Sequence, residues 1–200
     1  FGSELRIAVL DAAPNAVHLP DSRASALSAA SQRLLDTLGV WGKIRAEAQP
    51  VSRIEITDSS LDDAFRQPVL SYDNAIDGAP ATWIVENARL TTALQTAARA
   101  TPGIVLLDKS EIRTAAPGSH ASTITLADGR ALAATLVVAA DGRRSALRQA
   151  AGIKVVGWDY PQTGIITTVS HERPHGGRAI QHFLPAGPFA ILPLQGNRAC

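Results

Sequence analysis

The stretch LVVAADGRRSALRQAAGI, residues 136–153, decides the fold class. Its first five residues are apolar with no polar alternation, which is typical of a strand covered on both faces, as in a parallel sheet. Asp141 and Gly142 would end that strand. Ser145 can then cap a helix, which Gly152 is well placed to stop. The stretch therefore predicts a buried strand, a turn and a short helix, which is the repeating unit of an α/β fold.

Asp141 would lie at the carboxyl end of this strand, where open α/β sheets bind their ligands. Its carboxylate could accept hydrogen bonds from ribose hydroxyls, and Gly142 would let a ligand approach the backbone closely. Arg143, Arg144 and Arg148 place positive charge nearby, which suits phosphate groups. On the local pattern alone, an ordinary strand–turn–helix with a solvated Asp-Gly turn explains these residues equally well.

Composition excludes several classes of protein. The chain has 200 residues, of which 46% are hydrophobic, enough for one large domain or two small ones. A net charge of +1 and the lack of a basic run with interleaved aromatic residues argue against nucleic-acid binding. No apolar run approaches the roughly 20 residues that a transmembrane helix needs. The single cysteine, Cys200, excludes an internal disulfide.

Hydrophobic periodicity predicts strands and helices that alternate over most of the chain. The Leu34, Leu35 and Leu38 stripe is expected to lie in the core, and Trp41 and Trp83 are expected to be packing residues. Asp128-Gly129 predicts a hairpin. Strands are predicted at 5–11, 51–57, 69–72, 83–85, 104–107, 110–116, 122–126 and 131–134, and helices at 24–38, 40–44 and 88–100.

After Gly152 the helical periodicity ends, and strand-like runs follow at 164–172, 179–184 and 189–194. They predict a sheet of antiparallel strands. The fold class is therefore α/β (α+β overall), with a partial α/β domain over 1–153 and a partial β-rich domain over 154–200, between which some strands can be shared. Both ends resemble interrupted elements, so the chain is expected to be a piece of a longer protein.

Four stretches resemble the class A flavoprotein aromatic hydroxylases of the 4-hydroxybenzoate hydroxylase fold. Residues 141–148 resemble the DGxxSxxR signature of that family. Three more are similar to motifs of its ubiquinone-biosynthesis hydroxylases (2-octaprenyl-6-methoxyphenol hydroxylase-like): residues 21–41 to DxRxxALS…LGVW, 85–94 to VxNxxLxxAL, and 175–194 to HGG…FLPxGPxAxLPL. The four stretches follow the family's order and spread over nearly the whole chain.

This resemblance implies a Rossmann-like FAD-binding domain, incomplete here, and the start of a β-sheet substrate domain. In such enzymes FAD is reduced by NADH or NADPH and forms a flavin hydroperoxide with O2. That species hydroxylates the aromatic ring of a polyprenylated phenol in ubiquinone biosynthesis. The resemblance assigns no catalytic side chain. No metal site is expected, because Pro174 between His171 and His175 does not suit a helix that presents both to a metal.

The resemblance also implies which residues bind the ligands. Asp11 is expected to bond the adenosine ribose, and Arg23 to lie near the pyrophosphate or the ribityl chain, with Arg89 also on the flavin side. Asp141, with Gly142, would hold the ribityl or pyrophosphate region, and the surrounding loop could meet the nicotinamide cofactor. The cavity over the flavin ring would be lined by Phe183, Pro185, Leu192, Pro193 and Leu194.

Two departures from the family keep a second hypothesis open. The GxGxxG loop that cradles the FAD pyrophosphate would precede Ser3, and a GDxxH motif would follow Cys200. This stretch alone is therefore expected to hold FAD poorly. The alternative is a non-catalytic accessory relative that binds a lipid-like quinone precursor or a protein partner without a working FAD site. A plain NAD-binding dehydrogenase fits the β-rich second half poorly.

The expected partner is a small phenolic or quinone-precursor molecule, with no nucleic acid. The expected location is cytoplasmic. The lipophilic substrate of the family leaves open a peripheral association with the inner membrane or with a biosynthetic complex. The ring position that is hydroxylated, the choice between NADH and NADPH, and the oligomeric state are left open by the sequence.

Overall fold

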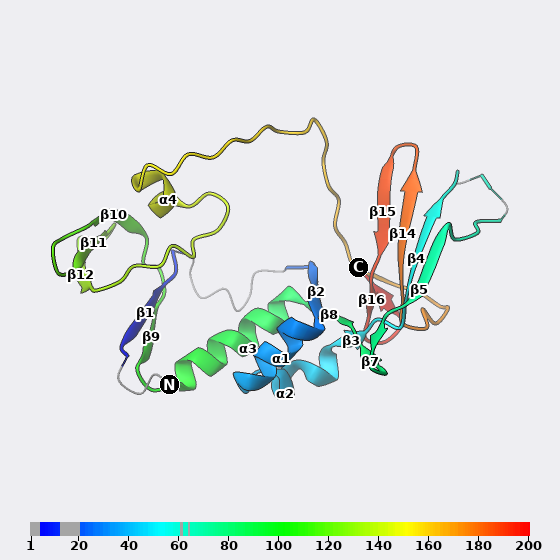
Figure 1. Ribbon diagram of the computed structural model, residues 1–200, viewed down its shortest axis with the longest axis horizontal. Coiled ribbons are helices and arrows are strands. Elements are labelled where there is room, and N and C mark those ends of the chain that lie inside the picture. Colours follow the sequence, from blue (N-terminus) through cyan, green and yellow to red (C-terminus); the bar gives the residue numbers. More distant parts are fainter. Residues whose placement is uncertain (1–4, 13–20, 61, 64) are drawn as a thin grey trace. The chain divides into compact units, whose positions relative to one another are not determined.

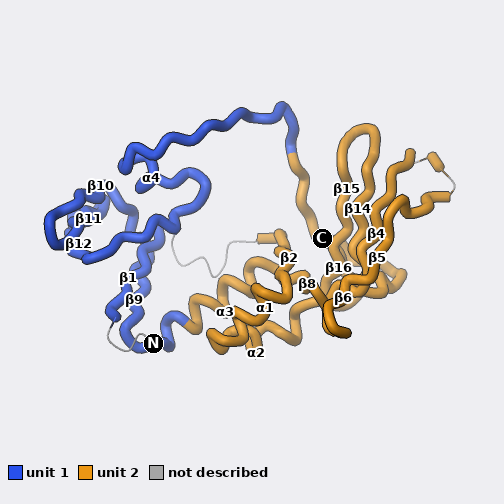
Figure 2. Tube along the Cα trace, in the orientation of Figure 1, with its two compact units in different colours: residues 1–18, 98–163 blue, residues 19–97, 164–200 orange. Residues whose placement is uncertain are grey.

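The computed structural model describes residues 5–12, 21–60, 62–63 and 65–200, and it has a mixed α/β fold, as predicted (Figure 1). The chain divides into two compact units, which Figure 2 shows in different colours. Unit 1 comprises residues 1–18 and 98–163, and unit 2 comprises residues 19–97 and 164–200. The expected division into an FAD-binding and a substrate domain at residue 153 stays a prediction, because compactness alone does not define a ligand-binding domain.

Unit 1 contains a parallel pair of strands. β1 (Ile7–Leu10) and β9 (Ile104–Leu107) run in register, with Ile7 opposite Ile104 and Leu10 opposite Leu107. Both strands were predicted from their short apolar runs. The pairing continues one residue further, because the N–H of Asp11 donates to the Leu107 carbonyl at 3.0 Å. Asp11 therefore lies directly at the carboxyl end of β1.

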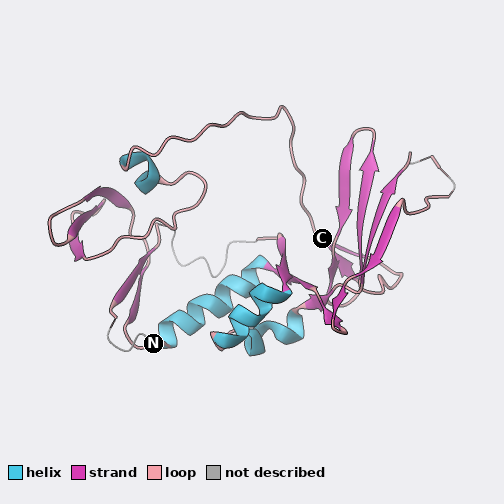
Figure 3. Cartoon of the chain, viewed as in Figure 1, coloured by secondary structure: helices cyan, strands magenta, loops and turns pink. Residues whose placement is uncertain are grey.

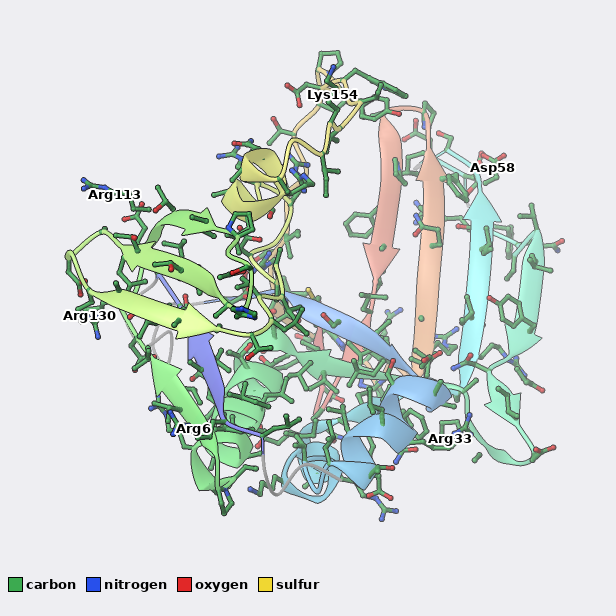
Figure 4. All side chains as sticks on the ribbon, turned by 60° about the vertical axis from the view of Figure 1, so that its left-hand side comes forward. Arg6, Arg33, Asp58, Arg113, Arg130 and Lys154 are labelled. Carbon is green, nitrogen blue, oxygen red and sulfur yellow. The ribbon has the colours of Figure 1, made fainter. Side chains whose placement is uncertain are left out.

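Unit 1 also contains a three-stranded antiparallel sheet of β10 (Ile112–Ala116), β11 (Ser122–Leu126) and β12 (Ala131–Ala134). The turn at Asp128-Gly129 joins β11 to β12, as predicted. Gly129 has φ +89°, a conformation that glycine adopts without strain. Figure 4 labels Arg113 on β10 and Arg130 beside this turn. Ile124 and Leu126 of β11 are buried.

The strand predicted at 136–140 is wrong. These residues form a loop between β12 and α4 (Ala146–Ala150) in Figure 3, and Leu136 and Val138 are 77% and 74% exposed. An apolar run becomes a strand only where a neighbouring strand accepts its hydrogen bonds, and no strand in the described part of the chain pairs with it. The predicted helix and its signals are confirmed: Ser145 caps α4 and Gly152 follows it with φ +70°.

The helices of unit 2 pack beside a small antiparallel sheet (Figure 1). Its strand order is β2-β8-β3, and the helices are α1, α2 and α3 with one 3-10 turn, η2. The bounds are β2 (Ala24–Ser28), β3 (Gln49–Pro50), β8 (Thr82–Glu86), α1 (Ala29–Thr37), α2 (Trp41–Ile44), η2 (Arg45–Glu47) and α3 (Asn87–Ala100).

The helix predicted over 24–38 is wrong in its first five residues, which form β2. That segment pairs with β8 from Ala24 opposite Glu86 to Ser28 opposite Thr82. The helix starts only after Ser28, whose hydroxyl oxygen accepts the N–H of Ser31 at 3.2 Å. Pairing with a strand far along the chain therefore overrides the local helical pattern.

The core of unit 2 confirms the packing role of both tryptophans. Trp41 and Trp83 meet edge to face, with ring centroids 5.4 Å apart. Of the predicted leucine stripe only Leu35 is buried in this core, whereas Leu34 and Leu38 are exposed, so that prediction is wrong for those two. The other buried members are Val40, Ile44, Ala48, Val85 and Ala93.

The rest of unit 2 contains a four-stranded mixed sheet in the order β15-β14-β4-β5, a three-stranded sheet in the order β13-β17-β16, and the pair of β6 and β7. The antiparallel pairing expected after Gly152 is confirmed for β14 with β15, β13 with β17 and β16 with β17. The parallel pairing of β14 with β4, a strand from earlier in the chain, was not predicted. The run predicted at 164–172 contains only the two-residue strand β13. The bounds are β4 (Arg53–Asp58), β5 (Leu70–Asp73), β6 (Ala75–Ile76), β7 (Ala79–Pro80), β13 (Val169–Ser170), β14 (Arg178–Leu184), β15 (Gly187–Ile191), β16 (Pro193–Leu194) and β17 (Arg198–Ala199).

Candidate cofactor site

Arg23 is held by a carboxylate two residues before it. Its Nε and Nη2 donate to Oδ1 and Oδ2 of Asp21, each at 2.8 Å, and its backbone N–H donates to Oδ1 at 3.0 Å. Asp21 therefore occupies one edge of the planar guanidinium, and the Nη1 group lies on the other edge. The Arg23 side chain is 62% exposed, so other molecules can reach it from solvent.

Asn87 joins this ion pair to α3. Its backbone N–H donates to the Arg23 carbonyl at 3.0 Å, and its Oδ1 accepts from the Ser25 hydroxyl at 2.6 Å. With Oδ1 used in this way, the amide NH2 stays available as a donor, and the Asn87 side chain makes a small contribution to the lowered pKa of Asp21. These bonds tie the chain at the start of β2 to the first residue of α3.

Two more arginine–carboxylate pairs lie near the start of α3. Arg89 Nε is 2.8 Å from Oε2 of Glu47, and Arg198 donates through Nη1 and Nη2 to both oxygens of Glu86 at 3.1 and 3.0 Å. The hydrogen bond from Arg198 holds the pKa of Glu86 below its ordinary value. Because each arginine faces a carboxylate, an anion would be recognised here by directed N–H groups and not by net charge.

The Asp21–Arg23 pair gives a prediction for acid pH. The Arg23 side-chain hydrogen bond lowers the pKa of Asp21 from 3.8 to about 2. A carboxyl group with a depressed folded-state pKa contributes stability that is fully present above pH 3.8 and is lost as the pH falls toward 2. We expect the Asp21 carboxyl carbon to titrate near pH 2 by NMR, and at a higher pH in Arg23→Ala, which removes the side-chain bonds but keeps the backbone N–H that donates to Asp21. A wild-type midpoint near pH 3.8 would contradict the ion pair in solution.

Asp141 organises its own loop. Its Oδ2 accepts the N–H of Leu147 at 3.3 Å, and the Ser145 hydroxyl that caps α4 accepts the N–H of Arg148 at 2.9 Å. The Ser145 side chain, followed by backbone N–H groups, holds the pKa of Asp141 below its ordinary value. Gly142 has φ +81°, and nothing lies within 4 Å of where a Cβ would be. The turn is thus stiffened by Asp141 and leaves the backbone at Gly142 open to approach.

Asp11 is fixed through its backbone. Its N–H donates to Leu107 and its carbonyl accepts from the N–H of Ser110 at 2.7 Å, so the residue is held between β1 and the chain after β9. The residue is exposed. A carboxylate held at the end of a parallel strand pair suits hydrogen bonds to sugar hydroxyls.

The residues expected to line a substrate cavity differ in exposure. Phe183 is 47% exposed on β14, in register with Asp58, which Figure 4 labels at the end of β4. Pro185 is exposed in the two-residue turn between β14 and β15. Leu192 packs against a core cluster and Pro193 is buried. Contact of any of these residues with a substrate stays a prediction.

His175 fixes the loop that precedes β14. Its Nε2 lies 2.9 Å from the carbonyl oxygens of Leu194 and Gly196, and its Nδ1 lies 2.9 Å from the N–H of Gly177. This arrangement requires the neutral ring with its proton on Nε2. The neighbouring open hollow of about 250 Å³ was not predicted; it is lined by Ser52, Arg53, Asp73, Gly176 and Arg178. Its arginines pair with Asp73 and Glu55, so its charges balance.

The predicted cofactor residues fall in both units. Asp11, Asp141 and Gly142 belong to unit 1, on different elements, and Arg23 and Arg89 belong to unit 2, where both lie close to the start of α3. Sequence reasoning missed the residues that orient the arginines. Two of them were inside the quoted motifs: Asp21 opens DxRxxALS, and Asn87 is the Asn of VxNxxLxxAL.

Metal binding and membrane insertion are the two other kinds of site that bear on function. No three or more His, Cys, Asp or Glu side chains in the described part of the chain are grouped so that they could hold a metal ion. None of the helices formed by the described residues has both the length and the apolar character required to cross a membrane.

Comparison with known proteins gives consistent matches. A family model for the FAD binding domain matches residues 5–197. The chain is 43% identical over 180 residues to ubiquinone hydroxylase UbiL of Rhodospirillum rubrum, covering 90% of this chain and 41% of that protein. It is 36% identical over 187 residues to 3-demethoxyubiquinol 3-hydroxylase of Escherichia coli, covering 90% of this chain and 45% of that protein. The chain therefore spans less than half the length of these relatives.

Solved structures share the fold. PqsL of Pseudomonas aeruginosa, in complex with 2-aminobenzoylacetate, superposes with a TM-score of 0.77 at 18% identity, over 97% of this chain and 52% of that one. HpxO of Klebsiella pneumoniae, complexed with FAD and uric acid, superposes with a TM-score of 0.69 at 15% identity, over 100% of this chain and 56% of that one. At such identities the likeness concerns the fold alone.

Proposed function

Since the chain belongs to the family of FAD-binding monooxygenase domains, we propose that it acts in the hydroxylation of the aromatic ring of a polyprenylated phenol in ubiquinone biosynthesis. The observation that carries this proposal is the match of residues 5–197 to the FAD binding domain, together with 43% identity to a ubiquinone hydroxylase. A relative at that identity supports the reaction type more strongly than the ring position.

The residues near the start of α3 fit the anionic part of FAD. Asp21 accepts from Nε and Nη2 of Arg23 and does not use Nη1, and the Arg89 side chain is 61% exposed. α3 has 14 residues, and its first N–H groups carry partial positive charge. Two guanidinium groups and a helix amino end suit a pyrophosphate. We assign Arg23 and Arg89 to this part of the cofactor.

The remaining predicted residues suit the other parts of the ligands. We assign Asp11 to the adenosine ribose, and the loop of Asp141 and Gly142 to the ribityl or pyrophosphate region, where the open backbone allows close approach. Phe183 and Pro185 would offer apolar surface to the ring and its polyprenyl chain, and Leu192 and Pro193 would support them.

The cofactor supplies the hard chemistry of such a reaction. Bound FAD would activate O2 for insertion of one oxygen atom into the ring, with electrons from NADH or NADPH. The residues of this chain would bind the cofactor and the substrate, orient them toward each other and exclude water. Because the proposed substrate is lipophilic, we also propose that the protein meets it in the cytoplasm at the surface of the inner membrane, as a peripheral protein or in a biosynthetic complex.

Titration with FAD, followed by flavin fluorescence, tests this proposal. It should be made on this chain and on the protein encoded by the full reading frame, with each protein after thermal unfolding as the control. We expect saturable quenching for the full reading frame and weaker binding for this chain. If neither binds FAD, the enzyme proposal fails, and an accessory protein that binds a quinone precursor without FAD takes its place.

A further inference from the structure

We propose that Asp21 is a positioning residue for FAD binding, which acts by holding the guanidinium of Arg23 with one edge occupied and the other edge turned to an anionic group. Asn87 anchors the backbone of Arg23 in this arrangement, because its N–H donates to the Arg23 carbonyl at 3.0 Å. The inference rests on the proposed function, in which Arg23 contacts the pyrophosphate or ribityl region of FAD, and it adds a residue that does not itself touch the cofactor.

The fork geometry determines which donors of Arg23 stay available. A guanidinium has five N–H groups, and Asp21 takes one from Nε and one from Nη2, at 2.8 Å each. One N–H of Nη1 and the second N–H of Nη2 project in parallel from the outer edge, and the other N–H of Nη1 points back toward Cδ. The outer edge can still form two parallel hydrogen bonds with a phosphate, so Arg23 can bind an anion while it is paired with Asp21.

The hydrogen bonds around Asp21 make this orientation stiff. The carboxylate receives the backbone N–H of Arg23 in addition to the fork, so three bonds from one residue hold it. Asn87 is itself fixed by the Ser25 hydroxyl and by its N–H to the Arg23 carbonyl. A long side chain held in this way has already lost rotamer freedom that ligand binding would otherwise remove.

The charge of Asp21 acts in the opposite direction. A carboxylate against the same guanidinium weakens its attraction for a phosphate, although solvent and salt screen this effect at an exposed pair. If positioning dominates, removal of Asp21 weakens FAD binding, and if charge competition dominates, removal strengthens it. The two explanations therefore differ in the sign of one measured quantity.

A double-mutant cycle on the full-reading-frame protein tests the inference through the FAD dissociation constant, measured by flavin fluorescence without turnover. The variants are Asp21→Ala, Arg23→Ala and both together. Asp73→Ala is the matched control, because Asp73 is the carboxylate of the exposed Arg53–Asp73 pair. We expect Asp21→Ala to raise Kd about 3- to 10-fold, Asp73→Ala to leave it unchanged, and Asp21→Ala to add nothing where Arg23 is already alanine.

Each outcome separates this inference from the proposed function. If wild type binds FAD and Asp21→Ala leaves Kd unchanged or lowers it, the positioning role is wrong while the proposed function stands. If Asp21→Ala weakens FAD binding equally with and without the Arg23 side chain, Asp21 acts on the fold, which also overturns the inference. If wild type does not bind FAD, the proposed function fails first. Should Asp21→Ala not fold, Asp21→Asn keeps the shape and one acceptor, and about a 2- to 3-fold weakening is expected.

Discussion

Trp41→Ala is expected to lower the free energy of unfolding by about 3–5 kcal/mol. Trp41 is 6% exposed and meets Trp83 edge to face at 72°. Ile44 and Val85 surround it, one on a helix and the other on a central strand, and both are almost fully buried. The gap left by the indole therefore cannot close. The variant loses the burial of the indole and also the favourable contact between the two aromatic rings.

Urea denaturation followed by far-UV circular dichroism measures this effect, because the signal does not depend on the substituted tryptophan. Leu38→Ala is the matched control: it also removes an apolar side chain, at the C-terminal end of α1, but Leu38 is 58% exposed and should change stability by only about 0.5 kcal/mol. A Trp41→Ala protein within about 1 kcal/mol of wild type would mean that the two-tryptophan core is not formed in solution.

Elements encoded by local chemistry could be predicted from the sequence. The hairpin follows from Asp128-Gly129, whose glycine takes the positive φ that the turn needs. The helix α4 follows from its own cap and stop signals at Ser145 and Gly152. In these cases the residues that determine the conformation are within a few positions of one another, so no knowledge of the rest of the fold is required.

Two elements could not be predicted because they depend on distant partners. Residues 24–28 have helical spacing, yet they pair with β8, which lies far along the chain. Residues 136–140 have the composition of a buried strand, yet they have no strand partner in the described chain. An apolar run indicates only that its burial is favourable. Whether it becomes a strand depends on neighbouring strands that can form hydrogen bonds with it.

The candidate site shows the same division. Motif resemblance predicted Arg23 and Arg89 as cofactor residues, which stays a prediction, but it did not predict the carboxylates that pair with such arginines. Glu86 and Arg198 are 112 residues apart in the chain and form a bidentate ion pair, a relation that composition and spacing do not encode. Asp21 is only two residues from Arg23, so a search for short-range partners of each candidate cation could have found it.

Gly177→Ala is expected to destabilise the protein by about 2–4 kcal/mol, although glycine to alanine is a small change. Gly177 has φ +71°, where a Cβ costs about 1–2 kcal/mol. The new Cβ would also lie 2.9 Å from Ser52 Oγ and 3.3 Å from the Pro50 carbonyl oxygen. Ser52 Oγ could move away only by giving up its 2.8 Å hydrogen bond to the Gly176 carbonyl.

The neighbouring glycine supplies the matched control. Gly176 has φ +61°, but nothing lies within 4 Å of the position that a Cβ would take there, so Gly176→Ala should cost only the backbone strain of about 1–2 kcal/mol. Urea denaturation of both variants isolates the clash, since the strain is common to them. In a Ser52→Ala background the Gly177→Ala penalty should shrink toward that of Gly176→Ala, because the 2.9 Å contact is gone. Equal penalties for the two glycines in the wild-type background would show that the loop after His175 does not pack on Ser52.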